Sequence, residues 1–577
     1  MEIHHEKIGD LPLIAQIIKS SGLVSCIDKH YPTHGNWRSP SVGNLMLGWL
    51  MYIISENDHR VYKVEDWAKE HLVSLRWALD APELTSKSFQ DDRLANLLER
   101  FTDKAAWEAM LSEHSAHLIR LYELPTDIAR VDSVNIPAYR DPEEGSLFQF
   151  GHRKNHQPNL PQVKTMLVSL DPLALPITSI TVDGKRSDEP LYIPAIEQAR
   201  AALGATGVLY VGDSKLCNLE NCSYIASTGN FYMGPLSRTQ YSEQSLRVSV
   251  QQALEDKESW QSINSISRID PKTKELEELG QAYELPQRER CNPQTQFWWN
   301  ERLVAILDPV AQRTQKESLE NRLKMAQLEI LERFIPKKRR LVFKEEHRTE
   351  ANTFINKVLT KFKVKEFLET DLFVAKEVAK EVAKEVAKRK DLIYIKITLK
   401  EQEIADFNTF AGWRIYATNA PLERLQTKDV LPCYRQEFLI EQQFHKLLTK
   451  TTSLLPLYLK NEGRIDALIR ILCLALQFVA TIQYTARQQL AKQNEKMDDL
   501  VPGNKGRKTE KPTAEILLKR FSPVTAVWIK VPNQPLVAKL INFEPVHTKI
   551  LKMLNCPDDL YVTFMNAFDY VNEPAPS

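Results

Sequence analysis

The stretch DIARVDSVNIPAY, residues 127–139, marks the point at which the sequence changes from a helical to a strand-like pattern. Before it, apolar residues recur at intervals of three and four, the spacing of one face of a helix. Within it, short apolar runs rich in Val and Ile predict a strand. The stretch also contains Asp132 in the middle of that strand. A carboxylate at such a position needs a partner or a cation, because burying an unpaired charge is unfavourable.

Further strand-like runs and two helical segments follow this stretch. Their order is three strands, a helix, a strand, a second helix and a strand, which predicts an α/β fold with a mixed sheet covered by helices. This order matches the ribonuclease H-like fold. The predicted strands are 128–136, 162–170, 176–184, 207–217 and 230–236, and the predicted helices are 190–204 and 218–228.

The length and composition indicate a globular protein with several domains. A chain of 577 residues is too long for one hydrophobic core, and its 43% hydrophobic and 26% charged residues are typical of folded proteins. The N-terminus lacks the basic and apolar runs of a signal peptide. Seven cysteines without a CxxC pair indicate reduced thiols rather than a zinc knuckle or a disulfide framework. We therefore expect a cytoplasmic protein.

The most apolar stretch, residues 467–484, is interrupted by Arg470 and Gln477. A membrane span needs about 20 predominantly apolar residues, so this stretch predicts a buried core helix and no membrane partner. The basic charge is concentrated elsewhere. Residues 311–400 carry 23 Lys and Arg against 14 Asp and Glu, although the whole chain has a net charge of only +1. This pattern suits contact with a polyanion, and equally a solvated helical surface.

The pattern along the chain predicts five regions. An N-terminal helical domain precedes the first part of the α/β core, and a largely helical insertion follows it. A near-perfect repeat in the insertion, VAKEVAKEVAKEVAK at 374–388, predicts an exposed helix without assigned chemistry. The regions are 1–120 (helical), 121–236 (core), 237–400 (insertion), 401–495 (last core strand and helices) and 496–577 (linker and small α/β appendage).

Two acidic residues lie on different strands of the predicted sheet. Asp132 is inside the first strand, and Asp213 is at the end of the fourth. Carboxylates on neighbouring strands repel each other unless a cation lies between them, and Mg²⁺ prefers oxygen ligands of this kind. A third carboxylate, Glu441, borders the apolar stripe of a helix predicted at 434–448. It is either a further metal ligand or a glutamate that reaches solvent from the edge of the stripe.

Several motifs together resemble the DDE transposases of bacterial insertion sequences, in the Tn-five and IS-four superfamily and closest to its IS-sixteen-thirty-four-like branch. The resemblance extends from residue 1 to about 490. It is carried by IHHEKIGDLPLIAQII (3–18), RVDSVNI (130–136), GHRKNHQPNLPQVKTMLVSL (151–170), VGDSKLCN (211–218), GWRIYATNAPL (412–422) and YRQEFLIEQQFHKLL (434–448). Each motif alone is weak, and their order and spacing make the match specific.

The resemblance implies a ribonuclease H-like core in which Asp132, Asp213 and Glu441 hold two Mg²⁺ ions, with Mn²⁺ as a substitute. It also implies double-stranded DNA as partner, namely the ends of the element and the target. Cleavage would free a 3′-hydroxyl that then attacks target DNA. Joining two element ends implies at least a homodimer. The N-terminal domain is the expected reader of those ends.

The family also has a tyrosine, arginine, glutamate and lysine signature around the third acid. Tyr434 and Glu441 fit it, but Glu437 stands at the arginine position and Leu448 at the lysine position. Glu437 is therefore a rival for the third metal ligand. The phosphate-contacting role falls to nearby Arg435, Lys446 or Lys450.

Other residues are candidates for DNA contact, each beside a structural alternative. One group lies on the turn after the first strand, and another is the densest basic run of the insertion. Trp298 stands beside Trp299 and either stacks on a base at a cleaved end or packs the insertion's own core. The two basic groups are His152, Arg153 and Lys154, and Lys337, Lys338, Arg339 and Arg340.

Two other functions remain open from the sequence. A metal-dependent nuclease on the same fold would hydrolyse DNA without joining it, and the long insertion before the last acidic helix favours the transposase over it. A DNA-binding derivative without activity would have lost part of its site, whereas all three acids are present here.

Overall fold

A computed structural model of the chain describes two compact units. It describes residues 1–33, 37, 40–138, 141–142, 145–151, 160–269, 276–335, 343–374, 392–436, 438–449, 452, 454–455, 457, 459, 461–501, 503 and 506–568. The first unit comprises 1–234, 291–299 and 434–577, and the second comprises 235–290 and 300–433. The five regions predicted from the sequence remain predictions.

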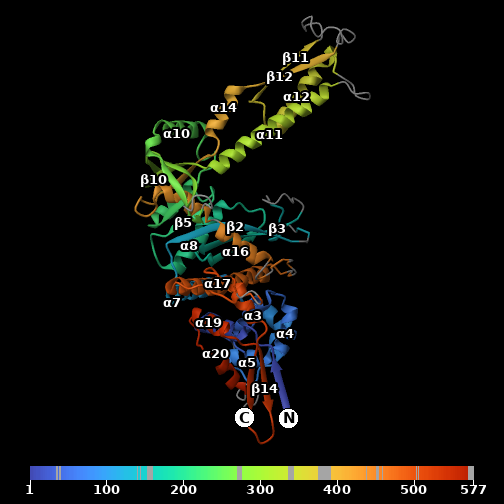
Figure 1. Cartoon of the computed structure of the whole chain (residues 1–577), viewed down its shortest axis with the longest axis vertical. Coiled ribbons are helices and arrows are strands. Elements are labelled where there is room, and N and C mark those ends of the chain that lie inside the picture. Colours follow the sequence, from blue (N-terminus) through green and yellow to red (C-terminus); the bar gives the residue numbers. More distant parts are fainter. Residues whose placement is uncertain are drawn as a thin grey trace. The chain divides into compact units, whose positions relative to one another are not determined.

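The first unit contains a mixed sheet with the predicted order of elements (Figure 1). The strands lie in the order β4-β3-β2-β5-β6. β2 pairs antiparallel with β3 and parallel with β5, β3 pairs antiparallel with β4, and β5 pairs parallel with β6. This arrangement is compatible with a ribonuclease H-like core. The elements are β2 (Ile128–Pro137), β3 (Gln162–Leu170), β4 (Leu175–Asp183), α8 (Tyr192–Leu203), β5 (Leu209–Gly212), α9 (Leu219–Ser227) and β6 (Phe231–Pro235).

Burial explains why these segments form a central sheet. Every residue of β3 is buried, which requires cover on both of its faces. α8 packs against β3 and β4, and α17 (Glu462–Gln493) packs against β4. A polar residue on β3 must therefore find its partner inside the protein. This condition applies to Lys164, which lies on β3 near the candidate site.

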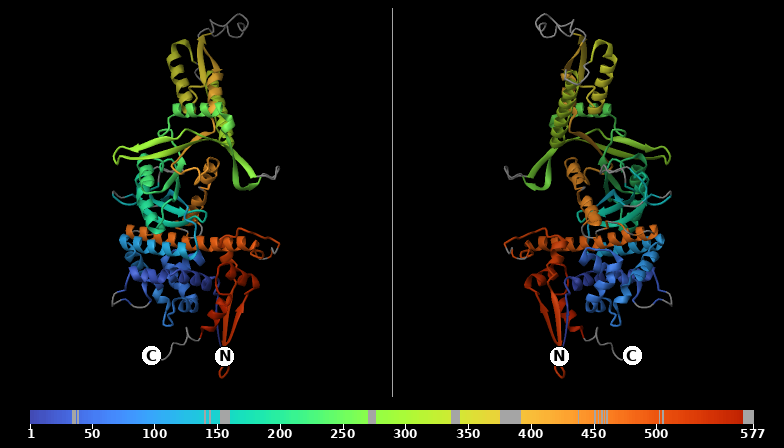
Figure 2. Two further views of the ribbon diagram at one scale, coloured as in Figure 1. Left: turned by 90° about the vertical axis from the view of Figure 1, so that its left-hand side faces the viewer. Right: turned by 90° about the vertical axis from the view of Figure 1, so that its right-hand side faces the viewer.

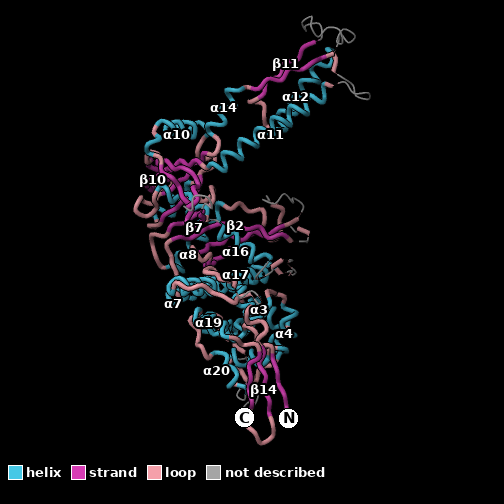
Figure 3. The backbone as a smooth tube through the Cα atoms, viewed as in Figure 1, coloured by secondary structure: helices cyan, strands magenta, loops and turns pink. Residues whose placement is uncertain are grey.

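The N-terminal helices share one hydrophobic core with the C-terminal segment. Residues 1–120 are not helical throughout, because β1 (Glu2–Glu6) pairs with β14 (Thr525–Lys530), which pairs with β15 (Val537–Ile541) (Figure 3). The C-terminal appendage thus folds onto the N-terminal region. The helices of both are α1 (Leu11–Ser20), α2 (Leu23–His30), α3 (Val42–Glu56), α4 (Val64–Glu70), α5 (Leu72–Leu79), α6 (Asp91–Arg100), α7 (Lys104–Leu121), α18 (Ala514–Lys519), α19 (Pro545–Met553) and α20 (Leu560–Asn566).

The predicted core helix at 467–484 is the central part of α17. Figure 2 shows α17 as one long helix, and it packs on α3 and α6. Among the described residues, α17 is long and apolar enough to span a membrane. The bent pair α1 and α2 would be a second candidate if the two helices are taken together as one span. The apolar window of α17 is entirely buried inside the protein.

The helix predicted at 434–448 is two helices. α15 (Val430–Arg435) ends before a turn at Gln436, and α16 (Phe438–Thr449) begins after it. The predicted apolar stripe is present, because Ile440, Phe444 and Leu447 are buried. Glu437 lies outside the described residues.

The second unit contains strands as well as helices, so the expectation of a largely helical insertion was wrong. Four strands lie in the order β13-β10-β8-β7, β9 pairs with β10, and β11 pairs with β12 beside α11 and α12. The four-residue repeat after Val374 lies outside the described residues. The elements are α10 (Glu243–Glu255), β7 (Gln261–Ile269), β8 (Leu276–Glu284), β9 (Arg288–Asn292), β10 (Phe297–Leu307), α11 (Pro309–Phe334), α12 (Arg348–Phe362), β11 (Leu368–Val374), β12 (Ile393–Leu399), α14 (Glu401–Phe410) and β13 (Trp413–Thr418).

A buried histidine gives the first unit a dependence on pH. His114 on α7 is fully buried, and its Nε2 lies 3.2 Å from the Ser21 Oγ. Burial first, and the nearby charge of His117 second, lower the His114 pKa from 6.5 to about 3. As the pH falls below 6.5, His114 binds a proton in the unfolded chain but remains neutral in the folded chain. Stability that is present above pH 6.5 is therefore lost progressively towards pH 3.

We expect His114→Gln to weaken this pH dependence. Between pH 7 and pH 5 the native chain should lose about 2 kcal/mol of unfolding free energy through His114, and the variant should not lose this contribution. Urea titrations at the two pH values measure the difference. His5→Gln, which changes an exposed histidine on β1, is the control. An equal pH dependence in the native chain and His114→Gln would contradict the prediction.

Candidate active site

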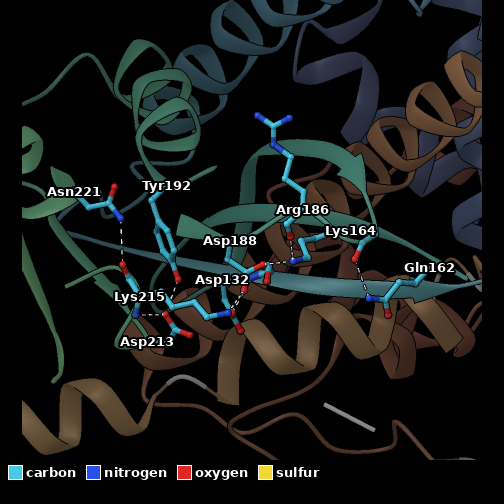
Figure 4. A network of polar contacts seen from close by, with 11 residues as sticks. Asp132, Gln162, Lys164, Arg186, Asp188, Tyr192, Asp213, Lys215 and Asn221 are labelled. Carbon is cyan, nitrogen blue, oxygen red and sulfur yellow. Dashed lines mark hydrogen bonds and ion pairs between the residues drawn. The ribbon is translucent and has the colours of Figure 1, made fainter. Parts of the chain in front are cut away.

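The parallel pairing of β2 and β5 brings two aspartates to the same level of the sheet. Val131 on β2 lies opposite Gly212 on β5, and the next residues are Asp132 and Asp213. Asp132 is buried and Asp213 is half-buried. Figure 4 shows both carboxylates in one network of polar side chains. The sequence predicted this pair, and together Asp132 inside β2 and Asp213 just after the end of β5 form the acidic part of the site.

Tyr192 on α8 and the backbone after β5 hold the Asp213 carboxylate. The Tyr192 hydroxyl donates a hydrogen bond of 2.7 Å to the Asp213 Oδ1, and the Lys215 backbone N–H donates to the same oxygen at 2.9 Å. Burial first, and then the charges of Asp213 and Asp132, raise the Tyr192 pKa well above its ordinary value. Tyr192 therefore remains a donor at any physiological pH and fixes the orientation of Asp213.

A third aspartate, Asp188, joins two lysines beside this pair. The Lys164 Nζ lies 2.6 Å from the Asp188 Oδ1, and the Lys215 Nζ forms an ion pair with the Asp188 Oδ2. Burial alone would raise the Asp188 pKa, but both ammonium groups outweigh it and lower that pKa. For Lys215, burial is outweighed by Asp188, Asp213 and Asp132, which raise its pKa. Two cations and three carboxylates thus share the site.

A small pocket lies beside Asp132, between β2, β5 and the chain around α15 and α16. Arg130, two residues before Asp132 on β2, is buried in an ion pair with Asp171, with an Nη2 to Oδ2 distance of 2.6 Å. Its Nη1 also donates to the Tyr434 carbonyl at 3.4 Å. Arg130 therefore ties β2 to the end of α15. The pocket is lined by Arg130, Val131, Asp132, Val211, Gly212, Tyr434 and Ile440.

Glu441 is in the first turn of α16, directly after Ile440, and its side chain is exposed. α16 packs on β2 and α17, with the buried face formed by Ile440, Phe444 and Leu447. The structure thus brings Asp132 and Asp213 together and sets the helix with Glu441 against β2. The role of Glu441 as third metal ligand remains a prediction.

The donor set at the site suits a hard cation. Asp213 accepts its hydrogen bonds through Oδ1, which leaves Oδ2 without a hydrogen-bond partner among the described residues. The two aspartates supply carboxylate oxygens, which are donors of the kind that Mg²⁺ and Mn²⁺ bind. The two aspartates therefore fit the divalent ion that the sequence predicts.

The other predicted DNA-contacting residues are spread over the chain. Tyr434 and Arg435 are half-buried at the end of α15. The Lys446 Nζ lies 3.2 Å from the Glu515 Oε1, so this lysine already has a structural ion pair within the first unit. Lys450, His152, Arg153, Lys154, Lys337, Lys338, Arg339 and Arg340 lie outside the described residues.

The two tryptophans separate into different environments. Trp299 is buried and its Nε1 donates a hydrogen bond of 2.9 Å to the Tyr232 hydroxyl, so this indole is part of the core. Trp298 is 63% exposed. Trp299 is therefore a core residue, but its partner Tyr232 lies on β6 of the first unit and not in the insertion's own core, as the packing alternative expected. Stacking on a base remains a prediction for Trp298.

Sequence reasoning missed four residues of the site: Lys164, Asp188, Tyr192 and Lys215. Lys164 carried a signal in the sequence, because it is the one charged residue in the strand QVKTMLVSL. Lys215 also carried one, since it lies two residues after Asp213. No sequence pattern pointed to Asp188 or Tyr192, because only the folding of the loop and of α8 over the sheet brings them to the aspartates.

Comparisons with protein-family models and with curated proteins found no match. A comparison with solved structures found similarity to a piggyBac transposase synaptic complex with hairpin DNA, determined by cryo-electron microscopy. The TM-score is 0.35 and the sequence identity 8%, over 99% of this chain and 87% of that chain.

Proposed function

We propose that this chain is a DNA transposase of an insertion sequence, of the DDE type that its motifs resemble. The observation that carries the proposal is the adjacency of Asp132 and Asp213 on the parallel strands β2 and β5. It is supported by the contact of α16, the helix that carries Glu441, with β2. An acidic site of this kind suits metal-dependent chemistry at phosphorus.

In this proposal Asp132, Asp213 and Glu441 would hold two Mg²⁺ ions, or Mn²⁺ in their place. Ions held there would supply activation of the attacking oxygen and stabilisation of the leaving oxygen at a phosphodiester. The protein's own groups prepare the site. Tyr192 orients the Asp213 carboxylate, and Lys215 adds positive charge where DNA phosphates would approach.

The proposed substrate is double-stranded DNA, first the terminal repeats of the element and then the target. Water would attack a phosphodiester at the element end and free a 3′-hydroxyl. That hydroxyl would then attack a phosphodiester of the target strand, whose broken bond releases a 3′-hydroxyl of the target. We propose the N-terminal helices as the reader of the ends and the basic segment 311–400 as a further contact with phosphates. Synapsis of two ends requires at least a dimer, and the reaction would occur in the cytoplasm.

A joining assay with pre-cut ends tests the function. Purified protein, Mg²⁺, target plasmid and oligonucleotides carrying the termini that flank this gene are incubated, and covalent joining is measured. The proposal predicts joined products that depend on Mg²⁺ or Mn²⁺ and on the terminal sequence. Cleavage without joining would favour a nuclease on the same fold. Sequence-specific DNA binding without cleavage or joining would favour an inactive DNA-binding derivative.

A further inference from the structure

A second cluster of possible metal ligands lies among the N-terminal helices. Cys26 and His30 are four residues apart on α2, so both side chains lie on the same face of the helix. Glu113 on α7 lies opposite them. The ligand atoms of the three residues all lie within 4.8 Å of one another. The cluster is not part of the acidic site on β2 and β5.

The three side chains lie at the edge of the hydrophobic core and contact one another or α7 through polar atoms. The His30 Nε2 lies 2.8 Å from the Glu113 Oε2. The Cys26 Sγ lies 3.5 Å from the Met110 carbonyl, so it faces α7. Cys26 is buried, whereas Glu113 is exposed. An ion can therefore approach from solvent on the Glu113 side and reach the thiol behind it.

The three donors are a thiol, an imidazole and a carboxylate, and zinc binds all three. Zn²⁺ takes Cys sulfur at about 2.3 Å and His nitrogen at about 2.0–2.1 Å, in tetrahedral geometry. Donor atoms around such an ion stand roughly 3.3–3.7 Å apart. The His30 and Glu113 donors, now 2.8 Å apart, have to separate slightly, and more widely spaced donors have to approach by up to about 1 Å, which side-chain rotation can supply. We propose that Cys26, His30 and Glu113 form a zinc site that joins α2 to α7, with water as the fourth ligand.

Lys29 is the competitor that a bound ion has to displace. Its Nζ lies 2.7 Å from the Glu113 Oε2, and its side chain is 63% exposed. An exposed ion pair contributes little to stability, so its loss is a small penalty. Burial, and then the charge of Glu113, raise the Cys26 pKa to about 11, so the thiol gives up a proton to solvent when the ion binds.

Zinc binding would fix one helix pair of the first unit. α2 has only eight residues and is joined to α7 through side-chain packing and the Glu113 contacts. An ion held by both helices stabilises the folded state by an amount that grows with the logarithm of the free ion concentration above the dissociation constant, because the unfolded chain does not assemble the site. The acidic site prefers Mg²⁺, whereas the thiol selects zinc, so the two sites take different metals.

The test uses the full chain after chelator treatment, with Zn²⁺ and Co²⁺ as the probes. Zinc content after dialysis and the intensity of the thiolate-to-cobalt charge-transfer absorption are measured. The charge-transfer absorption requires a cysteine ligand, so cobalt bound at the aspartates does not contribute to it. We expect about one zinc per chain and a cobalt–thiolate band, both lost in Cys26→Ser and in His30→Gln. Cys222→Ser, which changes a fully buried cysteine on α9, should retain both.

A further variant tests the assignment of Glu113. Lys29→Met removes the competing ammonium group and should tighten zinc binding several-fold. Weaker or unchanged binding in Lys29→Met would overturn Glu113 as a ligand. Absence of the cobalt–thiolate band in the native chain, or its persistence in Cys26→Ser, would overturn the site as a whole.

Discussion

Asp132→Asn and Asp213→Asn are each expected to lower the rate of Mg²⁺-dependent DNA cleavage by about a thousandfold, equivalent to roughly 4 kcal/mol of activation free energy. An amide has nearly the shape of the carboxylate but no charge to hold a divalent ion. The Tyr192 hydroxyl can still donate to the amide oxygen at position 213, so the local structure should persist. We therefore expect loss of activity without loss of folding.

The comparison requires a control carboxylate from the same sheet. Asp183 ends β4 and accepts a hydrogen bond from its own turn, through the Lys185 backbone N–H. Asp183→Asn should cut DNA at the native rate. All three variants should bind end DNA as the native chain does, measured by fluorescence anisotropy. Native cleavage rates in Asp132→Asn or Asp213→Asn would rule out these residues as metal ligands.

Arg130→Met is expected to lower the free energy of unfolding by about 3–5 kcal/mol, the largest stability effect that we predict. The Arg130 guanidinium and the Asp171 carboxylate are both almost fully buried, with 2% and 4% of their side chains exposed. Removal of the guanidinium leaves the Asp171 charge buried without its partner. Burial already raises the Asp171 pKa even with Arg130 present. The variant also loses the contact with the Tyr434 carbonyl.

A double variant separates the two causes. Asp171→Asn in the Arg130→Met background removes the unpaired charge and should recover part of the lost stability, because a neutral amide is easier to bury. The exposed pair of Lys496 and Glu510 provides the control, and Lys496→Gln should change stability by less than about 1 kcal/mol. Urea unfolding measures all three. A loss below about 1 kcal/mol in Arg130→Met would contradict the prediction.

The sequence was sufficient for the sheet of the first unit and for its two aspartates. Buried strands appear in the sequence as short apolar runs between turns. The order of these runs and of the two helical segments matches the order of the elements from β2 to β6. Asp132 was visible because a carboxylate inside such a run is unusual. The two aspartates were expected on neighbouring strands, and the structure shows that these strands, β2 and β5, pair in parallel.

Long-range pairing left no comparable signal. β1 has the sequence EIHHE, is mostly exposed, and pairs with a strand at the other end of the chain, from Glu2 opposite Lys530 to Glu6 opposite Ala526. Its one buried residue, Glu6, accepts hydrogen bonds from the Val73 and Ser74 backbone. Likewise, the turn at Gln436 interrupts a segment whose apolar spacing is helical throughout. These features depend on tertiary contacts, and the spacing of apolar residues along the sequence does not predict them.

The release of a 3′-hydroxyl end from DNA carrying the termini that flank this gene tests the central claim most directly. The rate is measured in Mg²⁺ for the native chain, Glu441→Gln and Glu437→Gln. We predict that the native chain and Glu437→Gln cut, and that Glu441→Gln does not. Cleavage by Glu441→Gln with an inactive Glu437→Gln would move the third acid to position 437. No cleavage by the native chain in Mg²⁺ or Mn²⁺ would contradict the proposed function.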